Sequence, residues 1–261
     1  MIFSCDGLVI RSVDYGENDK IITLLTPDRG KLSVSVKGAK SVRTKWGGAT
    51  SVFSYGNFTL YKKGDFHYLR EASVTAPFFG LTTDILKMAL ASYMCDVACD
   101  VTGEDEPAAD ILRLTLNSFH AMVSSDKPLP LIKAAFELRA AAFSGFAPDL
   151  SGCFICGEKN PREPIFDIMN GRIYCRSCLK SHPEINKPDR YNPEQRIIMK
   201  NLTPSTLAAL RFALSAPPAR ALSFELKDDE ELRIFEKVAQ EYLLNHLERG
   251  FDTLDFYLSM L

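Results

Sequence analysis

The sequence predicts an α+β protein with two domains: a small β-barrel at the N-terminal end, then an α-helical domain with an embedded four-cysteine module. Three observations predict this fold class. Apolar and polar residues alternate between Phe3 and Thr75, the apolar spacing changes to three and four residues after Pro77, and two Cys-x-x-Cys pairs follow in the second half. We therefore expect one domain over residues 1–79 and a second over residues 80–261.

Short alternating segments in the first region predict five strands. They cover residues 3–13, 19–26, 31–37, 52–63 and 66–75. In the third of these, Leu32, Val34 and Val36 share one face and polar residues share the other, so one face is expected to be buried. The segment from Thr26 to Gly30 has the proline and glycine of a tight turn. Five short antiparallel strands suit an OB-fold barrel, whose exposed face and loops bind single-stranded nucleic acid in many proteins.

Helical periodicity begins after Pro77. It predicts helices over residues 81–101, 108–123, 129–146, 193–200, 204–214 and 228–249. Pro128 and Pro130 mark the start of the third helix, and Gly145 with Pro148 marks its end. Gly250 is a plausible stop signal for the last one. The second region is therefore expected to be mainly helical.

The two Cys-x-x-Cys pairs predict a metal site. The pairs are separated by eighteen residues and consist of Cys153, Cys156, Cys175 and Cys178. Each pair can aim two sulfurs at one point, and four thiolates prefer zinc to magnesium or calcium. Because four protein ligands leave no position for water or substrate, we expect one structural Zn²⁺ in a module at about residues 151–180, with a turn at Asn170-Gly171. The alternative is four reduced cysteines without a metal.

Composition indicates the cellular compartment in which the protein is expected. The 261 residues are 46% hydrophobic, enough for a substantial core, and they contain neither a long apolar run nor an apparent signal peptide. Seven cysteines, four of them with metal spacing, suit a reducing compartment. We therefore expect a cytoplasmic protein that does not enter the membrane.

The net charge of −2 hides an internal polarity. Residues 1–80 carry eleven Lys or Arg and seven Asp or Glu, a surplus of +4, so the remainder carries −6. A positive N-terminal region can face a polyanion while the acidic remainder faces other partners.

A run of basic residues in the first region predicts a nucleic-acid surface. Its members are Arg29, Lys31, Lys37, Lys40, Arg43 and Lys45, with no acidic residue among them. Trp46, the only tryptophan, follows directly. Cations contact phosphates and an aromatic ring can stack on a base, which together suit single-strand binding. The alternative for Trp46 is a cap on the open end of the barrel. Tyr55, Phe58 and Tyr61 are expected to fill the barrel core.

No signature of an enzyme accompanies these features. The phosphate-binding Gly-x-x-x-x-Gly-Lys-Ser/Thr motif is missing, and the acidic cluster at residues 228–231 is in a position that suits a helix start. We therefore predict a protein that is not an enzyme. The alternative is a metal-dependent nuclease that uses the barrel to hold its substrate.

Several motifs in order resemble the RecO family of bacterial recombination and repair mediators. In the first region they are Gly7-Leu-Val-Ile10, Tyr15-Gly-Glu-Asn-Asp19, Leu24-Leu-Thr-Pro-Asp-Arg-Gly-Lys31 and Lys37-Gly-Ala39. In the second they are Phe136-Glu-Leu-Arg139, Gly145-Phe-Ala-Pro-Asp-Leu-Ser-Gly-Cys153 and Gly171-Arg-Ile-Tyr-Cys175. The resemblance covers nearly the whole chain. Near the C-terminal end, Gly250-Phe-Asp-Thr-Leu-Asp-Phe256 replaces a basic, serine-containing patch common in the family.

The resemblance implies a function as well as a fold. RecO-like proteins have an OB-fold, a helical domain and, in some members, a zinc module. They bind single- and double-stranded DNA and anneal complementary strands. With RecR they load RecA onto strands coated with single-stranded-DNA-binding protein, whose acidic C-terminal tail they bind, and RecF is a further candidate partner. The resemblance therefore implies a DNA repair mediator with DNA and proteins as partners.

Overall fold

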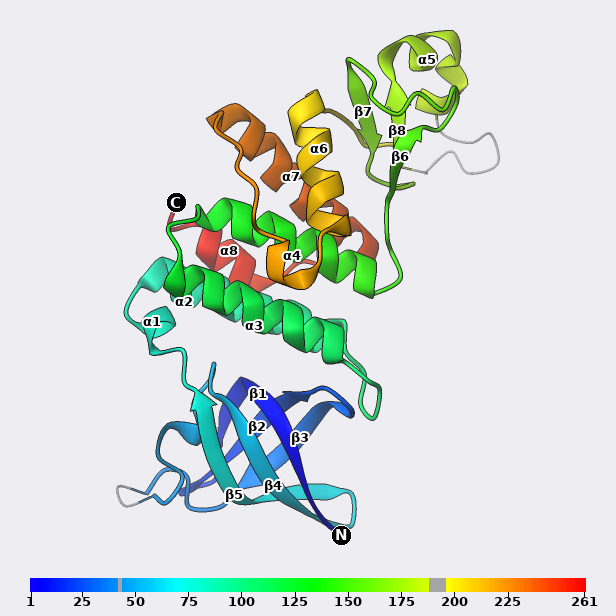
Figure 1. Cartoon of the computed structure of the whole chain (residues 1–261). Helices are drawn as coiled ribbons and strands as arrows, with labels where there is room; N and C mark the ends of the chain where they lie inside the picture. Colours follow the sequence, from blue (N-terminus) through cyan, green and yellow to red (C-terminus); the bar gives the residue numbers. More distant parts are fainter. Residues whose placement is uncertain (42–43, 188–195) are drawn as a thin grey trace. The chain divides into compact units, whose positions relative to one another are not determined.

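The computed structural model describes residues 1–41, 44–187 and 196–261. The chain forms two compact units. The N-terminal unit comprises Met1–Asp126 together with Phe251–Leu261, and the helical unit comprises Lys127–Gly250. Figure 1 shows the barrel and helices α1, α2, α3 and α8, which make up the first unit. The domain boundary predicted between residues 79 and 80 stays a prediction.

Five strands close into the predicted barrel (blue to cyan in Figure 1). They are β1 (Ile2–Tyr15), β2 (Asp19–Thr26), β3 (Gly30–Val36), β4 (Tyr55–Lys63) and β5 (Phe66–Ala76). Their order around the barrel is β1-β2-β3-β5-β4, with β1 also paired to β4 and a short parallel pairing between β3 and β5. This is the arrangement of an OB-fold. The fold class predicted from the sequence is therefore confirmed.

The inside of the barrel is filled by the residues that the alternation selects. Leu32, Val34 and Val36 are buried, whereas Lys31, Ser33 and Ser35 between them are more exposed. The same cluster includes Val9, Ile22, Leu24, Phe58, Leu60 and Leu69 from the other four strands. Burial of these side chains is the main stabilising term for so small a barrel.

Part of the barrel exterior is covered by helices. In the N-terminal unit these are α1 (Phe79–Thr82), α2 (Ile85–Asp100), α3 (Ala109–Ser124) and α8 (Asp252–Leu258). Leu8 and Leu25 face each other across β1 and β2 and are completely buried without belonging to the interior cluster. Helix α2 contacts β1, α3 contacts β2, and α8 packs on α2. The helices thus form a second layer on one part of the barrel.

The predicted helix over residues 81–101 is divided in two. Asp84 has an extended backbone, and its side chain accepts hydrogen bonds from the N–H groups of Leu86 and Lys87. This is an N-cap, which starts a new helix at Ile85 and separates it from the single turn of α1. The helices predicted over 108–123 and 129–146 are present as α3 and α4 (Leu129–Phe143).

The helical unit is built around three helices. Helix α4 packs against both α7 (Asp229–Leu247) and α6 (Pro204–Ser215), and α6 also contacts α7. The carboxylate of Asp228 caps α7 through the N–H groups of Glu230 and Glu231, and Glu248 ends it with a φ of 54°. The short 3-10 helices η2 (Pro183–Asn186) and η3 (Pro218–Arg220) also belong to this unit, whereas η1 (Gly47–Thr50) belongs to the N-terminal unit.

A four-stranded sheet carries the cysteine module. It consists of β6 (Asp149–Cys153), β7 (Pro164–Asp167), β8 (Arg172–Cys175) and β9 (Met199–Asn201), in the order β6-β8-β7-β9, and α5 (Arg176–Ser181) follows β8. The predicted turn at Asn170-Gly171 is confirmed, since Gly171 has a φ of 62° and joins β7 to β8.

Two features of the second region differ from the prediction. The helix predicted over residues 193–200 is wrong in its described part, because residues 199–201 pair with β7 as strand β9; residues 193–195 lie outside the described residues. Helix α8 follows Gly250 and was not predicted. In the described ranges of the chain, no helix is both long and apolar enough to span a membrane.

Candidate metal centre and nucleic-acid surface

The four cysteines predicted from spacing come together at one point. Their sulfur atoms all lie within 4.8 Å of one another, and those of Cys156 and Cys175 are 3.8 Å apart. Zinc–sulfur bonds of about 2.3 Å in a tetrahedron require sulfur separations of about 3.8 Å. Cys153 and Cys175 are buried, Cys178 is half-buried and Cys156 is exposed. The donor set therefore fits a structural metal ion held by four thiolates.

Backbone N–H groups prepare Cys153 to carry negative charge. Burial raises the pKa of its thiol, but N–H donors from Cys156, Cys175 and Ile155 outweigh burial and lower the pKa to about 6. The N–H of Cys175 lies 3.2 Å from the Cys153 sulfur. The pKa of the Cys178 thiol is raised to about 11, and burial is the largest cause. A positive ion between the four sulfurs would lower the pKa of these thiols and stabilise their thiolate forms.

Arg211 of α6 connects the segment around Cys153 and Cys156 to the rest of the helical unit through hydrogen bonds. Its guanidinium donates to the backbone oxygens of Leu150 and Lys159 at 2.6 and 2.5 Å and to the side-chain oxygen of Asn160 at 3.0 Å. The module's own apolar cluster is small, with Ile165, Tyr174 and Leu179 as its buried members. Such a cluster is too small to hold the sheet alone, so the hydrogen bonds of Arg211 add to the local order, and a metal ion on the four cysteines would add more.

Basic residues next to the cysteines have other partners. Arg172 lies over the ring of Phe154 at 4.0 Å, and Arg176 forms an ion pair with Glu163 at 3.0 Å. The Nδ1 atom of His182 is 3.0 Å from the Cys178 carbonyl oxygen, and His182 is not among the clustered ligand atoms of the described chain. The candidate metal ligands among the described residues are therefore the four cysteines.

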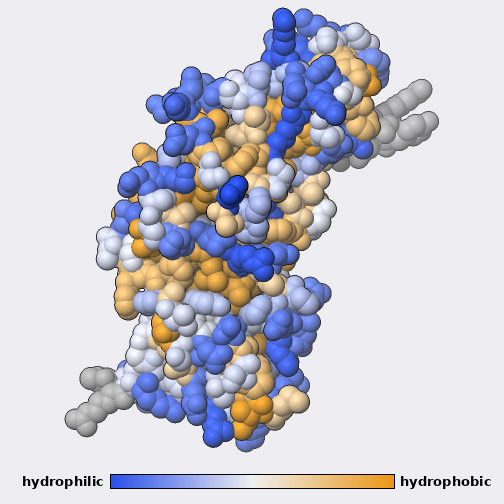
Figure 2. Space-filling view, viewed as in Figure 1, coloured by the Kyte–Doolittle hydropathy of each residue, from blue (hydrophilic) through white to orange (hydrophobic). Residues whose placement is uncertain are grey.

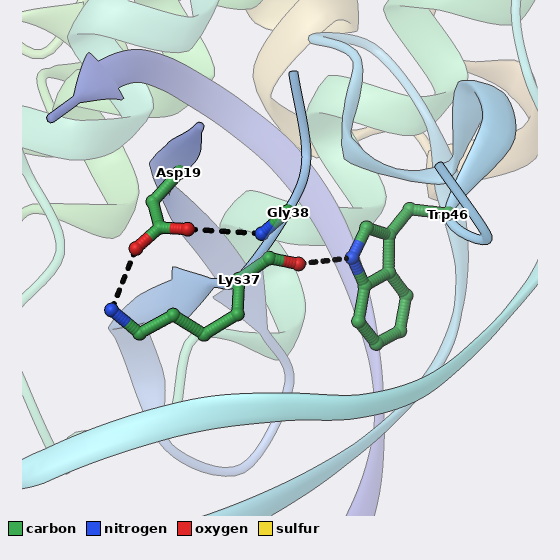
Figure 3. A network of polar contacts seen from close by, with 4 residues as sticks. All are labelled: Asp19, Lys37, Gly38 and Trp46. Atoms are coloured by element: carbon green, nitrogen blue, oxygen red, sulfur yellow. Dashed lines mark hydrogen bonds and ion pairs between the residues drawn. The ribbon is translucent and has the colours of Figure 1, made fainter. Parts of the chain in front are cut away.

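At one end of β3, Lys37 belongs to a compact polar network shown in Figure 3. Its ammonium donates to one carboxylate oxygen of Asp19 at 2.6 Å, while the other accepts from the N–H of Gly38 at 2.9 Å. The hydrogen bond from Lys37, with that from Gly38, lowers the pKa of Asp19. The Trp46 indole N–H donates to the Lys37 carbonyl at 2.8 Å. Asp19 thus positions Lys37, whose side chain is 64% exposed.

Trp46 packs into the barrel. Only 7% of the residue is exposed, and it belongs to the interior cluster with Val36 and Ala39. This arrangement matches the alternative of a cap on the open end of the barrel. A base could stack on this ring only after the ring had left the core, which would break the hydrogen bond to Lys37. The ammonium of exposed Lys45 lies 4.2 Å from the centre of the Trp46 ring.

The basic run is divided between the two ends of β3. Lys40 lies near Lys37 and pairs with Asp14 at 3.3 Å. Lys31 is at the opposite end, about 20 Å from Lys37 along an extended strand. Its ammonium donates to the Cys99 carbonyl in the last turn of α2 at 3.0 Å, and Arg29 lies over the ring of Phe3 at 4.5 Å. Arg43 lies outside the described residues. Lys37, Lys40 and Lys45 therefore form one group, and Arg29 and Lys31 another.

Two tyrosines on the barrel exterior were missed by the sequence reasoning. Of the aromatic residues expected in the core, Phe58 is buried, but Tyr61 points to the other face of β4 and stacks on Tyr68 of β5. Their ring centres are 5.0 Å apart with an interplanar angle of 16°. The signal was available, because residues 58 and 60 fill the interior and strict alternation then places Tyr61 outside.

Comparison with known families decides what kind of protein carries these sites. The family model for the N-terminal region of recombination protein O matches residues 1–78, and the model for its C-terminal region matches residues 82–191. The chain belongs to the RecO family. The RecO models thus cover both the barrel and the cysteine module. RecO proteins are recombination mediators and not enzymes, which is the class that the sequence predicts.

Curated RecO relatives span nearly the same length. The chain is 28% identical over 253 residues to the DNA repair protein RecO of Acetivibrio thermocellus, covering 96% of this chain and 94% of the relative. It is 25% identical over 256 residues to that of Alkaliphilus metalliredigens, with 98% of each covered. Against the RecO of Anaeromyxobacter sp. strain K the identity is 32% over 180 residues, covering 68% of this chain and 70% of the relative.

Proposed function

We propose that this RecO-family chain binds single- and double-stranded DNA through its barrel and anneals complementary strands. Together with RecR, it helps to load RecA onto strands coated with single-stranded-DNA-binding protein, and it contacts the acidic tail of that protein; RecF is a further candidate partner. The observation that carries the proposal is the closed OB-fold with exposed lysines near one end of β3. The reaction takes place in the bacterial cytoplasm and needs no cofactor turnover.

Charge neutralisation supplies the mechanism. Two single strands repel each other through their phosphates, and lysines that release condensed counterions reduce that repulsion. Base pairing then drives annealing. We assign phosphate contact to Lys37, Lys40, Arg43 and Lys45, with Trp46 supporting the Lys37 backbone from inside. Arg29 and Lys31 serve a second contact region at the other end of β3.

We propose that the metal is one structural Zn²⁺ held by Cys153, Cys156, Cys175 and Cys178. The sulfur geometry and the softness of four thiolates support zinc over magnesium or calcium. With every ligand position filled by protein, the ion holds the helical domain in shape and takes no part in DNA chemistry. The functional division is then a DNA-binding domain at residues 1–79 and a helical domain at residues 80–261.

Binding of single-stranded DNA should depend strongly on salt. If about four to six phosphates are neutralised, the logarithm of affinity should fall against the logarithm of salt concentration with a slope of roughly −3 to −4. Fluorescence anisotropy of a labelled oligonucleotide measures this slope across a salt series. A flat response would contradict the electrostatic part of the proposal.

Reversing three charges of the basic run should weaken binding. We expect Lys37→Glu, Lys40→Glu and Arg43→Glu together to lower affinity by about 10- to 100-fold and to reduce the magnitude of the salt slope by about 2. A matched control reverses exposed Arg220, Lys227 and Lys237 of the helical unit, which changes the net charge equally. Equal losses in both variants would show that net charge matters and the position does not.

Strand annealing separates the mediator from a nuclease. Labelled complementary strands, each coated with single-stranded-DNA-binding protein, are mixed with the protein and magnesium without ATP, and the products are resolved by size. Full-length duplex is the expected product. Shortened strands would overturn the proposal in favour of a metal-dependent nuclease.

A further inference from the structure

A continuous row of side chains runs around the outside of the barrel. Strand pairing connects Val13 to Ile21, Ile21 to Ser35, and Ser35 to Tyr68. It then connects Tyr68 to Tyr61 and Tyr61 to Ile2. We call these six positions the exterior row. All five strands contribute to it, and both tyrosines that stack on each other belong to it.

Five of the six side chains in the exterior row are aliphatic or aromatic, and none of the six is fully buried. Ile2, Val13 and Tyr61 have 57%, 49% and 36% of their surface open to solvent. By contrast, Leu8, five residues before Val13 on β1, and Leu25, four residues after Ile21 on β2, are completely buried beneath the helices of the N-terminal unit. Figure 2 shows an apolar patch among mostly hydrophilic side chains in the lower part of the view, where the barrel lies. An exposed apolar patch bordered by polar residues is typical of an interaction surface.

The charges beside the exterior row favour a polyanion as the occupant. On one side, Arg11 and Lys63 are exposed, and no ion pair to either occurs among the described residues. On the other side is Lys37, whose raised pKa is due first to its hydrogen bond from the ammonium to Asp19 and also reflects the phenols of Tyr68 and Tyr15. Cations therefore flank the aromatic pair, and Asp19 is already paired with one of them.

We propose that the exterior row is a base-stacking platform for single-stranded nucleic acid, with Tyr61 and Tyr68 at its centre and Lys37, Arg11 and Lys63 on the phosphates. This inference rests on the proposed DNA binding and deepens it. Tyrosine rings stacked in parallel can be extended by a base in the same orientation, and every base has a suitable face. Stacking on the platform would make the barrel bind unpaired strands more tightly than duplex, because only unpaired bases are accessible. Trp46 cannot supply this preference, since its ring is buried.

Comparing two ligands separates stacking from phosphate contact. A thymidine oligomer of about 20 nucleotides and an abasic oligomer of the same length carry the same phosphates, but only the first has bases. We expect the wild-type protein to bind the thymidine oligomer more tightly. Tyr61→Thr with Tyr68→Thr removes both rings but keeps residue types that favour strands. It should weaken that binding by about 10- to 100-fold and leave abasic binding and the salt slope unchanged.

Two control variants and two further measurements make the test specific. Tyr61→Phe with Tyr68→Phe keeps the rings and should keep the affinity, while Phe256→Ser removes an exposed aromatic residue from α8 and should have no effect. Circular dichroism checks that the threonine variant is folded. In the wild-type protein, quenching of a 2-aminopurine base within the oligomer reports stacking without any substitution.

The outcomes distinguish this inference from the proposed function. If the wild-type protein binds neither oligomer, DNA binding itself fails. If it binds both equally and quenches no 2-aminopurine, or if the threonine variant retains full affinity for the thymidine oligomer, the barrel binds phosphates only and the platform is overturned. A patch that contacts a protein partner would give this second result.

Discussion

Replacing Cys175 with serine is expected to empty the metal site and unfold the cysteine module. The sulfur of Cys175 is one of four within 4.8 Å of one another, and a serine hydroxyl is a poor ligand for the proposed zinc. Zinc binding in small structural sites contributes about 10 to 16 kcal/mol of apparent free energy to folding at neutral pH. The buried cluster around Ile165, Tyr174 and Leu179 is too small to replace that contribution.

Metal content and local stability measure the effect. Elemental analysis of protein purified without chelator should find a zinc ion in each wild-type chain and almost none in the Cys175→Ser variant. Limited proteolysis should then cut within β6 to α5. Cys99→Ser is the matched control, because Cys99 lies outside the cluster and should leave the metal in place. Wild-type protein without metal would refute the assignment.

Removing the charge of Lys133 is expected to destabilise the helical unit by about 3 to 5 kcal/mol. The ammonium of Lys133 is fully buried and lies 3.1 Å from Glu137, 3.4 Å from Glu236 and 2.7 Å from the side-chain oxygen of Gln240. These partners come from α4 itself and from α7, which pack closely together. Lys133→Met would leave a carboxylate in the core without the cation that balances it.

Urea unfolding of the Lys133→Met variant measures the loss. An added Glu137→Met change should recover part of it, because an apolar pair costs less than a buried carboxylate that has lost its cation. Arg233→Met removes a cation from an exposed pair with Glu230 on α7 and should change the free energy of unfolding by less than about 1 kcal/mol. A loss of that small size in Lys133→Met would show that the buried network contributes little.

The sequence predicts the metal ligands and the strands, but it does not predict which residues share a surface. The cysteine ligands are predictable because only two residues separate the members of each pair, so local geometry brings the two sulfurs of a pair together. The strands of the barrel are predictable from alternation. The division of the basic run is not, because extended β3 separates Lys31 from Lys37 although they are neighbours in the sequence.

Other differences have equally physical causes. Trp46 is buried because it packs in the interior cluster with Val36 and Ala39 and donates to the Lys37 carbonyl, contacts that no local pattern encodes. The segment before Asn201 is too short for its period to distinguish strand from helix, and pairing with β7 decides it. Tyr61 faces outward because Phe58 and Leu60 fill the interior and fix the phase of β4, a phase that the alternation of the sequence also carries.

Because helix α8 belongs to it, the N-terminal unit is formed by two separate segments of the chain. The residues of α8 are synthesised after every residue of the helical unit, although they pack on α2, which is synthesised before that unit. During translation the helical unit can therefore be complete while the barrel-bearing unit still lacks the helix that covers α2. A premature stop before Phe251 would leave that apolar face of α2 uncovered, so such truncated chains should aggregate through the half of the protein that was made first.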